Sequence, residues 1–164
     1  MRIAGIDLST MSVDIVTIQL DGPLEPRWYP ASLGKKAKDT SWETVGRVKQ
    51  ALDDAGCTRS MWDNIAVVYI EDPHSFGPQA AKALGLITGA VRALLPDRLQ
   101  DRCHRLAPQE WRVLCGLKAK ASKEDVAAHA DALGFTPGQR TQDAVDAWAV
   151  ALAGRALCEQ GAPS

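Results

Sequence analysis

Two β-like runs that each end in a carboxylate constrain this chain more than any other feature of its sequence. Arg2–Leu8 is an apolar run that ends around Asp7, and Ile65–Ile70 is almost entirely apolar and rich in β-branched residues before Glu71. Strands with apolar residues on both faces lie in the middle of a sheet and are covered on each side. The two acids therefore stand at the edge of a core, where an unpaired carboxylate is costly.

The rest of the sequence predicts one α/β domain. Val13–Leu20 alternates apolar and polar residues after a turn at Ser9–Ser12, which predicts a hairpin with the first strand, and Arg27–Ser32 completes an antiparallel meander. The remaining expected elements are helices over Ser41–Ala55, Pro78–Leu95, Ser122–Leu133 and from Thr141 to about Cys158, a short strand at residues 103–106 and a helical turn led by Pro108. A length of 164 residues without a repeat or linker predicts a single domain, residues 1–164.

Composition and charge exclude several functional classes. No apolar stretch reaches about 18 residues, so no transmembrane helix is expected, and Asp7 and Asp14 interrupt the run that a signal peptide would need. The four cysteines are scattered without a C-x-x-C pair, which is typical of reduced thiols in a cytoplasmic protein. The net charge is −1, yet residues 98–140 carry eight Lys or Arg against five acids. This distribution predicts a basic face for phosphate binding around an acidic centre.

Asp143 and Asp146 stand three residues apart at the start of the last expected helix. Residues at i and i+3 have β-carbons roughly 5–6 Å apart on one helix face, so both carboxylates can point the same way. A lone acid at a strand end or a helix start is most often a turn or capping residue. Two apolar strands ending in acids, followed by a D-x-x-D motif on an amphipathic helix, instead favour a metal site, because a divalent cation lets several carboxylates share one location.

Three stretches of the sequence carry these acids: IAGIDLS (Ile3–Ser9), VVYIED (Val67–Asp72) and QDAVDAWAVAL (Gln142–Leu152). In order and spacing they resemble the motifs of the RuvC family of Holliday junction resolvases, within the ribonuclease H-like superfamily. The resemblance covers most of the chain. It implies an α/β fold with a mixed sheet of about five strands, an N-terminal antiparallel meander and flanking helices. A short, divergent member of this family would suit a viral genome, and then a host cytoplasm, as well as a cellular one.

The resemblance implies a role for each of the four acids. Asp7, Glu71, Asp143 and Asp146 match, position by position, the four acidic metal ligands of the family's active site. The family is a homodimeric endonuclease that uses Mg2+ or Mn2+ to make paired nicks in four-way DNA junctions, with two ions expected in each site. The implied activity is that of a crossover junction endodeoxyribonuclease, a hydrolase of DNA recombination and repair. The implied partners are branched DNA and a second copy of the chain.

The same resemblance implies DNA contacts outside the acidic centre. Lys123 matches a basic residue of the family, and Lys118 and Lys120 can compensate for an earlier lysine that this chain lacks. Phe76 follows Glu71 by five residues, near the place where the family has a phenylalanine at the junction centre. We expect all four residues to contact DNA, the lysines through its phosphates.

Two further features bear on assembly and on the site. The helix Pro78–Leu95 is apolar on more than one face and contains Gly85 and Gly89, so it is expected to form a two-fold dimer interface. Leu8 and Ser9 stand where the family usually has proline and glycine. This departure leaves the first acid intact and changes the turn behind it.

Three alternatives share parts of the pattern. GIDLST also resembles the first phosphate loop of actin-like sugar kinases and chaperone ATPases, but these need two such domains and a second glycine-rich loop, which do not fit in 164 residues. A catalytically silent DNA-binding module would not need all four acids. Another ribonuclease H-like nuclease, acting on flaps, other branched DNA or RNA–DNA hybrids, would have almost the same acidic core. The sequence therefore predicts a metal-dependent resolvase of four-way junctions, with such a nuclease as the alternative.

Overall fold

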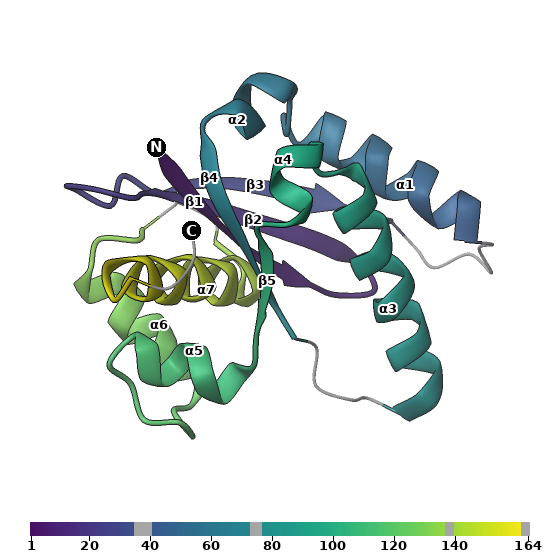
Figure 1. Cartoon of the computed structure of the whole chain (residues 1–164). Helices are drawn as coiled ribbons and strands as arrows, with labels where there is room; N and C mark the ends of the chain where they lie inside the picture. Colours follow the sequence, from purple (N-terminus) through teal and green to yellow (C-terminus); the bar gives the residue numbers. More distant parts are fainter. Residues whose placement is uncertain (35–40, 73–76, 137–139, 162–164) are drawn as a thin grey trace.

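A central mixed sheet with helices on both faces forms the fold in the computed structural model, which describes residues 1–34, 41–72, 77–136 and 140–161 (Figure 1). The strands are β1 (Arg2–Leu8), β2 (Ser12–Gln19), β3 (Arg27–Ser32), β4 (Ile65–Glu71) and β5 (Cys103–Leu106). Their order across the sheet is β3-β2-β1-β4-β5. The first three strands pair antiparallel as the predicted meander, whereas β4 is parallel to both β1 and β5.

The helices divide between the two faces of this sheet. They are α1 (Ser41–Asp54), α2 (Arg59–Asp63), α3 (Gly77–Leu94), α4 (Asp97–Gln100), α5 (Pro108–Leu114), α6 (Lys123–Ala132) and α7 (Gln142–Glu159). Helices α1 and α3 pack together on one face, and α7, backed by α5 and α6, covers the other (Figure 1). Among the described residues, no helix combines the length and the apolar character that a membrane crossing requires.

The predicted elements are present with boundaries shifted by one or two residues, and two short helices were not predicted. Helices α2 and α4 have five and four residues, too few to show a helical period in the sequence. They are connected by the side chain of Arg98 in α4, which donates hydrogen bonds to the backbone oxygens of Trp62 in α2 and Ile65 in β4. A long-range contact of this kind leaves no local sequence signal.

Alternation along β1 decides which face each side chain joins. Ala4, Ile6 and Leu8 point into the core beneath α1 and α3, while Ile3 joins the second core beneath α7. Successive residues of a strand point to opposite faces, so Asp7 shares the face of Ile3. The same rule places Glu71 with Val67 and Tyr69 on the α7 side of β4.

Helix α7 lies unusually close to β1 because Gly5 has no side chain. A β-carbon added at Gly5 would overlap the backbone oxygen of Ala147 and the backbone nitrogen of Ala151. Farther along α7, a β-carbon at Gly154 would overlap the ring of Tyr69 on β4. The two glycines thus set the distance between the helix and the sheet, and with it the position of the acids at the start of α7.

We expect Gly5→Ala to destabilise the protein by about 1–3 kcal/mol, because the added methyl group must displace the α7 backbone. Gly46→Ala, in α1, is the matched control: nothing lies within 4 Å of its added β-carbon. This exchange should raise stability by about 0.5–1 kcal/mol through helix propensity alone. Urea unfolding of both variants measures the two effects, and equal stability of Gly5→Ala and the unsubstituted chain would contradict the close approach of α7.

Candidate metal centre

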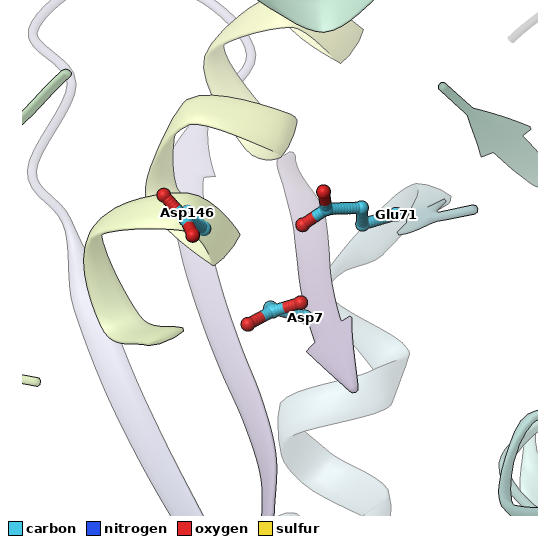
Figure 2. A group of neighbouring side chains, drawn as sticks. All are labelled: Asp7, Glu71 and Asp146. Carbon is cyan, nitrogen blue, oxygen red and sulfur yellow. The ribbon is translucent and has the colours of Figure 1, made fainter. Parts of the chain in front are cut away.

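The site lies where the carboxyl ends of two neighbouring parallel strands meet the start of α7. Strands β1 and β4 are paired in parallel, so Asp7 near the end of β1 and Glu71 at the end of β4 reach the same edge of the sheet. Figure 2 shows their carboxyl groups turned toward Asp146 on α7. Helix α7 begins at a defined residue because the Thr141 hydroxyl accepts a hydrogen bond from the Ala144 backbone N–H at 3.1 Å.

Three of the predicted acids form one cluster. Asp7, Glu71 and Asp146 are half-buried, and each offers a carboxylate oxygen within 4.8 Å of those of the other two (Figure 2). One Asp7 oxygen also accepts a hydrogen bond from the Leu8 backbone N–H at 2.9 Å. Several converging carboxylate oxygens are the ligand set that Mg2+ and Mn2+ prefer. The donor set therefore fits a hard divalent cation.

The electrostatics of the cluster also favour a bound cation. Burial raises the pKa of Asp7 well above its ordinary value, and the neighbouring charges of Glu71, Asp143 and Asp146 raise it further. Burial also raises the pKa of Asp146 to about 6, although a hydrogen bond from the Gln142 side chain and the nearby charge of Lys123 oppose this shift. The metal-free site thus concentrates negative charge that a bound cation would offset.

The fourth predicted acid, Asp143, borders this cluster and is not one of its three converging members. Its carboxylate instead accepts a hydrogen bond from the Ser12 hydroxyl of β2 at 3.3 Å. Its charge still raises the pKa of both Asp7 and Asp146, which places it beside them. That Asp143 is a metal ligand remains a prediction.

The predicted DNA-contacting residues lie at different distances from the acids. Lys123 is the first residue of α6, and its ammonium is close enough to lower the pKa of Asp146. Lys118 and Lys120 are exposed in the segment between α5 and α6. Phe76 lies outside the described residues.

Sequence reasoning missed two side chains next to the acids. Gln142 donates a hydrogen bond to Asp146 at 2.8 Å, which orients the carboxylate from the preceding turn of α7. Asp14, which lies outside the matched motifs, is opposite Asp7 in the β1–β2 ladder and only 3% exposed. Its carboxylate accepts a hydrogen bond from the Trp28 indole at 2.8 Å. The i, i+4 spacing of Gln142 and Asp146 is the one signal in the sequence that could have indicated either contact.

Comparison with known proteins finds similarity in structure alone. The sequence matches no known family model and no curated protein. The structure of Thermus thermophilus RuvC is similar with a TM-score of 0.72 and 22% identity, over 98% of this chain and 97% of that one. T. thermophilus RuvC in complex with a Holliday junction substrate gives 0.72 and 23%, over 98% and 96%. The yeast mitochondrial Holliday junction resolvase Ydc2 gives 0.62 and 12%, over 97% and 81%.

These similarities confirm the predicted fold. The five-stranded mixed sheet with its flanking helices is the ribonuclease H-like fold of the RuvC structures, shared over nearly the whole of both chains. At this level of identity the similarity concerns the backbone arrangement. The chemistry of this chain depends on its own acids and on their surroundings.

We expect Asp146→Asn to stabilise the metal-free protein at neutral pH. Because the pKa of Asp146 rises from 3.8 to about 6 on folding, the folded chain holds this proton more tightly than the unfolded chain. Stability is therefore lost as the pH rises from about 4 to about 6, and the loss is complete above that range. At pH 7.5 the free energy of unfolding of the variant should exceed that of the unsubstituted protein by about 1–3 kcal/mol. Near pH 4 the two values should be equal.

Urea unfolding in the presence of a chelator measures this difference. Asp63→Asn serves as the control, because Asp63 is exposed at the end of α2, beyond the opposite end of β4 from Glu71. The control should show no stabilisation at either pH. A variant Asp146→Asn that is no more stable than the control at pH 7.5 would refute the raised pKa of Asp146.

Proposed function

We propose that this chain is a metal-dependent endonuclease that resolves four-way DNA junctions by paired nicking. The observation that carries the proposal is the convergence of Asp7, Glu71 and Asp146 at the carboxyl edge of β1 and β4. The fold supports it, because this chain shares its length and architecture with a RuvC that has been seen in complex with a Holliday junction substrate. In this proposal the enzyme is a crossover junction endodeoxyribonuclease acting in recombination and repair.

The four acids would hold two Mg2+ ions, or Mn2+ in their place. Asp7 is the central member, because each of the other three acids raises its pKa. When bound, the ions supply an activated water and stabilise the leaving 3′ oxygen of the phosphodiester displacement. The chain's own part is to hold the ligands: the Leu8 backbone N–H orients Asp7, and Gln142 orients Asp146.

Lys118, Lys120 and Lys123 would bind the DNA backbone beside the acids. All three are exposed, and Lys123 is near enough to Asp146 to act on its charge. A phosphate held by Lys123 would therefore lie within reach of the acidic cluster. Phosphate contacts position the DNA without reading its sequence, as selection by branched shape requires. We also include Phe76 among the DNA-contacting residues, on the family resemblance alone.

A second copy of the chain would pack against α3. Gly85 and Gly89 are exposed on this helix, and nothing in the described structure lies within 4 Å of a β-carbon added at either position. Each glycine costs about 1 kcal/mol of helix propensity relative to alanine, without any gain in packing within the chain. Close approach of a partner helix would account for that cost. Two sites related by a two-fold axis would then cut two strands of one junction.

A cytoplasmic location goes with this function. The four cysteines are free, including the buried Cys57, Cys103 and Cys115. Free thiols are typical of proteins kept in a reducing compartment. If the protein is encoded by a virus, the compartment is the host cytoplasm.

Exchanging single acids tests the chemistry. Asp7→Asn and Asp146→Asn should each reduce magnesium-dependent nicking by orders of magnitude, because hydrolysis depends on cation-held water and leaving oxygen. Junction binding should persist or improve, since it rests on phosphate contacts and the exchange removes a negative charge near the DNA. The exposed Asp63 gives the control, and Asp63→Asn should cut normally.

The same assay separates the proposed substrate from its alternatives. A four-way junction, a flap, a plain duplex and an RNA–DNA hybrid are offered in parallel to the unsubstituted protein. Paired nicks confined to the junction support a resolvase. Preferential cutting of the flap or the hybrid would identify another ribonuclease H-like nuclease, and normal nicking by Asp146→Asn would refute the site itself.

The basic segment is tested by the salt dependence of binding. Each phosphate contact contributes roughly 0.9 to the slope of log K against log salt on duplex arms. Lys118→Ala combined with Lys123→Ala should therefore weaken junction binding and flatten this slope by about 1.8. If neither the affinity nor the slope changes, the DNA lies on another face of the protein.

The dimer is tested by light scattering at micromolar concentration, which should give the mass of two chains. Gly89→Leu places a large side chain on the exposed face of α3, so it should shift the mass toward one chain. Its melting temperature at low protein concentration should not fall, because the added side chain meets open space within the chain. A mass of one chain together with full junction cleavage would rule out the proposed assembly.

A further inference from the structure

The turn between β1 and β2 contains a directed chain of hydrogen bonds. The Ser9 hydroxyl oxygen accepts from the backbone N–H groups of Met11 at 3.1 Å and of Ser12 at 2.9 Å. It also lies 2.9 Å from the Ser12 hydroxyl oxygen. A hydroxyl has two lone pairs and one proton, so an oxygen that already accepts two bonds has its proton to give. Its two possible acceptors are the Ser12 backbone oxygen at 3.5 Å and the Ser12 hydroxyl oxygen at 2.9 Å, and the nearer hydroxyl is the better partner. Ser9 therefore donates to the Ser12 hydroxyl.

The chain of donors continues across the fold to Asp143. Because the Ser12 hydroxyl oxygen accepts from Ser9, its own proton is available, and the Asp143 carboxylate lies 3.3 Å away. The turn is also closed through its backbone, where the Ser9 N–H donates to the Ser12 oxygen at 3.0 Å. The turn thus presents a fixed donor to an acid at the start of α7.

Asp14 is the other acid beside Ser12, and its own donor comes from elsewhere. The indole N–H of Trp28, on the neighbouring strand β3, donates a hydrogen bond to the Asp14 carboxylate at 2.8 Å. Ser12 is also within hydrogen-bond reach of Asp14, so the two carboxylates compete for one proton. Because Asp14 already has the indole as a donor, Asp143 gains more from the Ser12 hydroxyl.

We propose that Ser9 and Ser12 are positioning residues that hold Asp143 in the orientation needed for metal binding. The inference rests on the proposed function, in which Asp143 joins the three converging acids as a ligand. Partners outside the ligand shell that hydrogen-bond a ligand fix its orientation and its affinity for the metal. A glycine after Leu8, as the resembled family usually has, would carry no hydroxyl and could not begin this chain of donors.

The test compares variants of the two serines by their affinity for Mn2+, without DNA, using the electron paramagnetic resonance signal of free Mn2+. Ser12→Ala should weaken binding roughly 10-fold, the effect expected for loss of an outer hydrogen-bond partner. Ser12→Thr keeps the hydroxyl and should restore most of the affinity. Ser9→Ala removes the upstream donor and the acceptor of two turn N–H groups but keeps the Ser12 hydroxyl, so its affinity should fall between those of the unsubstituted protein and Ser12→Ala.

Thr10→Ala is the matched control, because Thr10 belongs to the same turn and is outside this chain of hydrogen bonds. It should bind Mn2+ like the unsubstituted protein, and all variants should melt at similar temperatures in a chelator. Ser9→Ala keeps the test decisive if Ser12→Ala does not fold. Equal weakening by Thr10→Ala and Ser9→Ala, unchanged affinity of both serine variants, or no Mn2+ binding by the unsubstituted protein would each overturn the inference.

The measurement also separates this inference from the proposed function. If Mn2+ binding depends on the serines but the protein cuts no DNA, the positioning role is supported and the proposed nuclease function is refuted. If the protein resolves junctions but both serine variants bind Mn2+ with unchanged affinity, the nuclease function is supported and the positioning role is refuted.

Discussion

The contact between α7 and β1 at Gly5 is the constraint on which the rest of the site depends. Asp7 belongs to a strand in the middle of the sheet, and Asp146 belongs to a helix packed on that sheet. A helix usually stands off a sheet by the thickness of side chains. Here the helix backbone reaches the strand backbone at Gly5, so two short aspartate side chains can share one location. A larger residue at position 5 would push α7 away from β1 and so increase the distance between Asp7 and Asp146.

The site also opposes the stability of the fold that holds it. Burial, and to a lesser extent like charges, raise the pKa values of Asp7 and Asp146, so folding of the metal-free protein disfavours the ionised forms of both carboxyl groups. The hydrophobic core on both sides of the sheet has to offset this cost. Such a conflict is typical of binding sites, where groups are held ready for a ligand and not for their own lowest energy. A cation bound among the three acids would offset this cost.

The sequence predicted the sheet, the long helices and the three converging acids because each has a local or periodic signal. Two nearly all-apolar runs that end in carboxylates predicted Asp7 and Glu71 at the edge of the core, and the three-residue spacing of Asp143 and Asp146 predicted both on one face of the last helix. The contacts of Ser12 with Asp143 and of Trp28 with Asp14 had no such signal, because they join residues 131 and 14 positions apart through the fold. The same reason applies to the short helices α2 and α4, because the side chain of Arg98 in α4 bonds to the backbone oxygen of Trp62 in α2, far away in the sequence.

The order of the elements along the chain sets when the site can exist. Its three converging acids come from the first strand, from the middle of the chain and from the last helix, and the ladder between β1 and β4 already requires residues more than 60 positions apart. During synthesis, β1, β2 and β3 can pair with one another before α7 exists to cover β1. The acidic cluster is completed only when α7 has left the ribosome and docked at Gly5. A partly made chain therefore lacks the cluster of three acids.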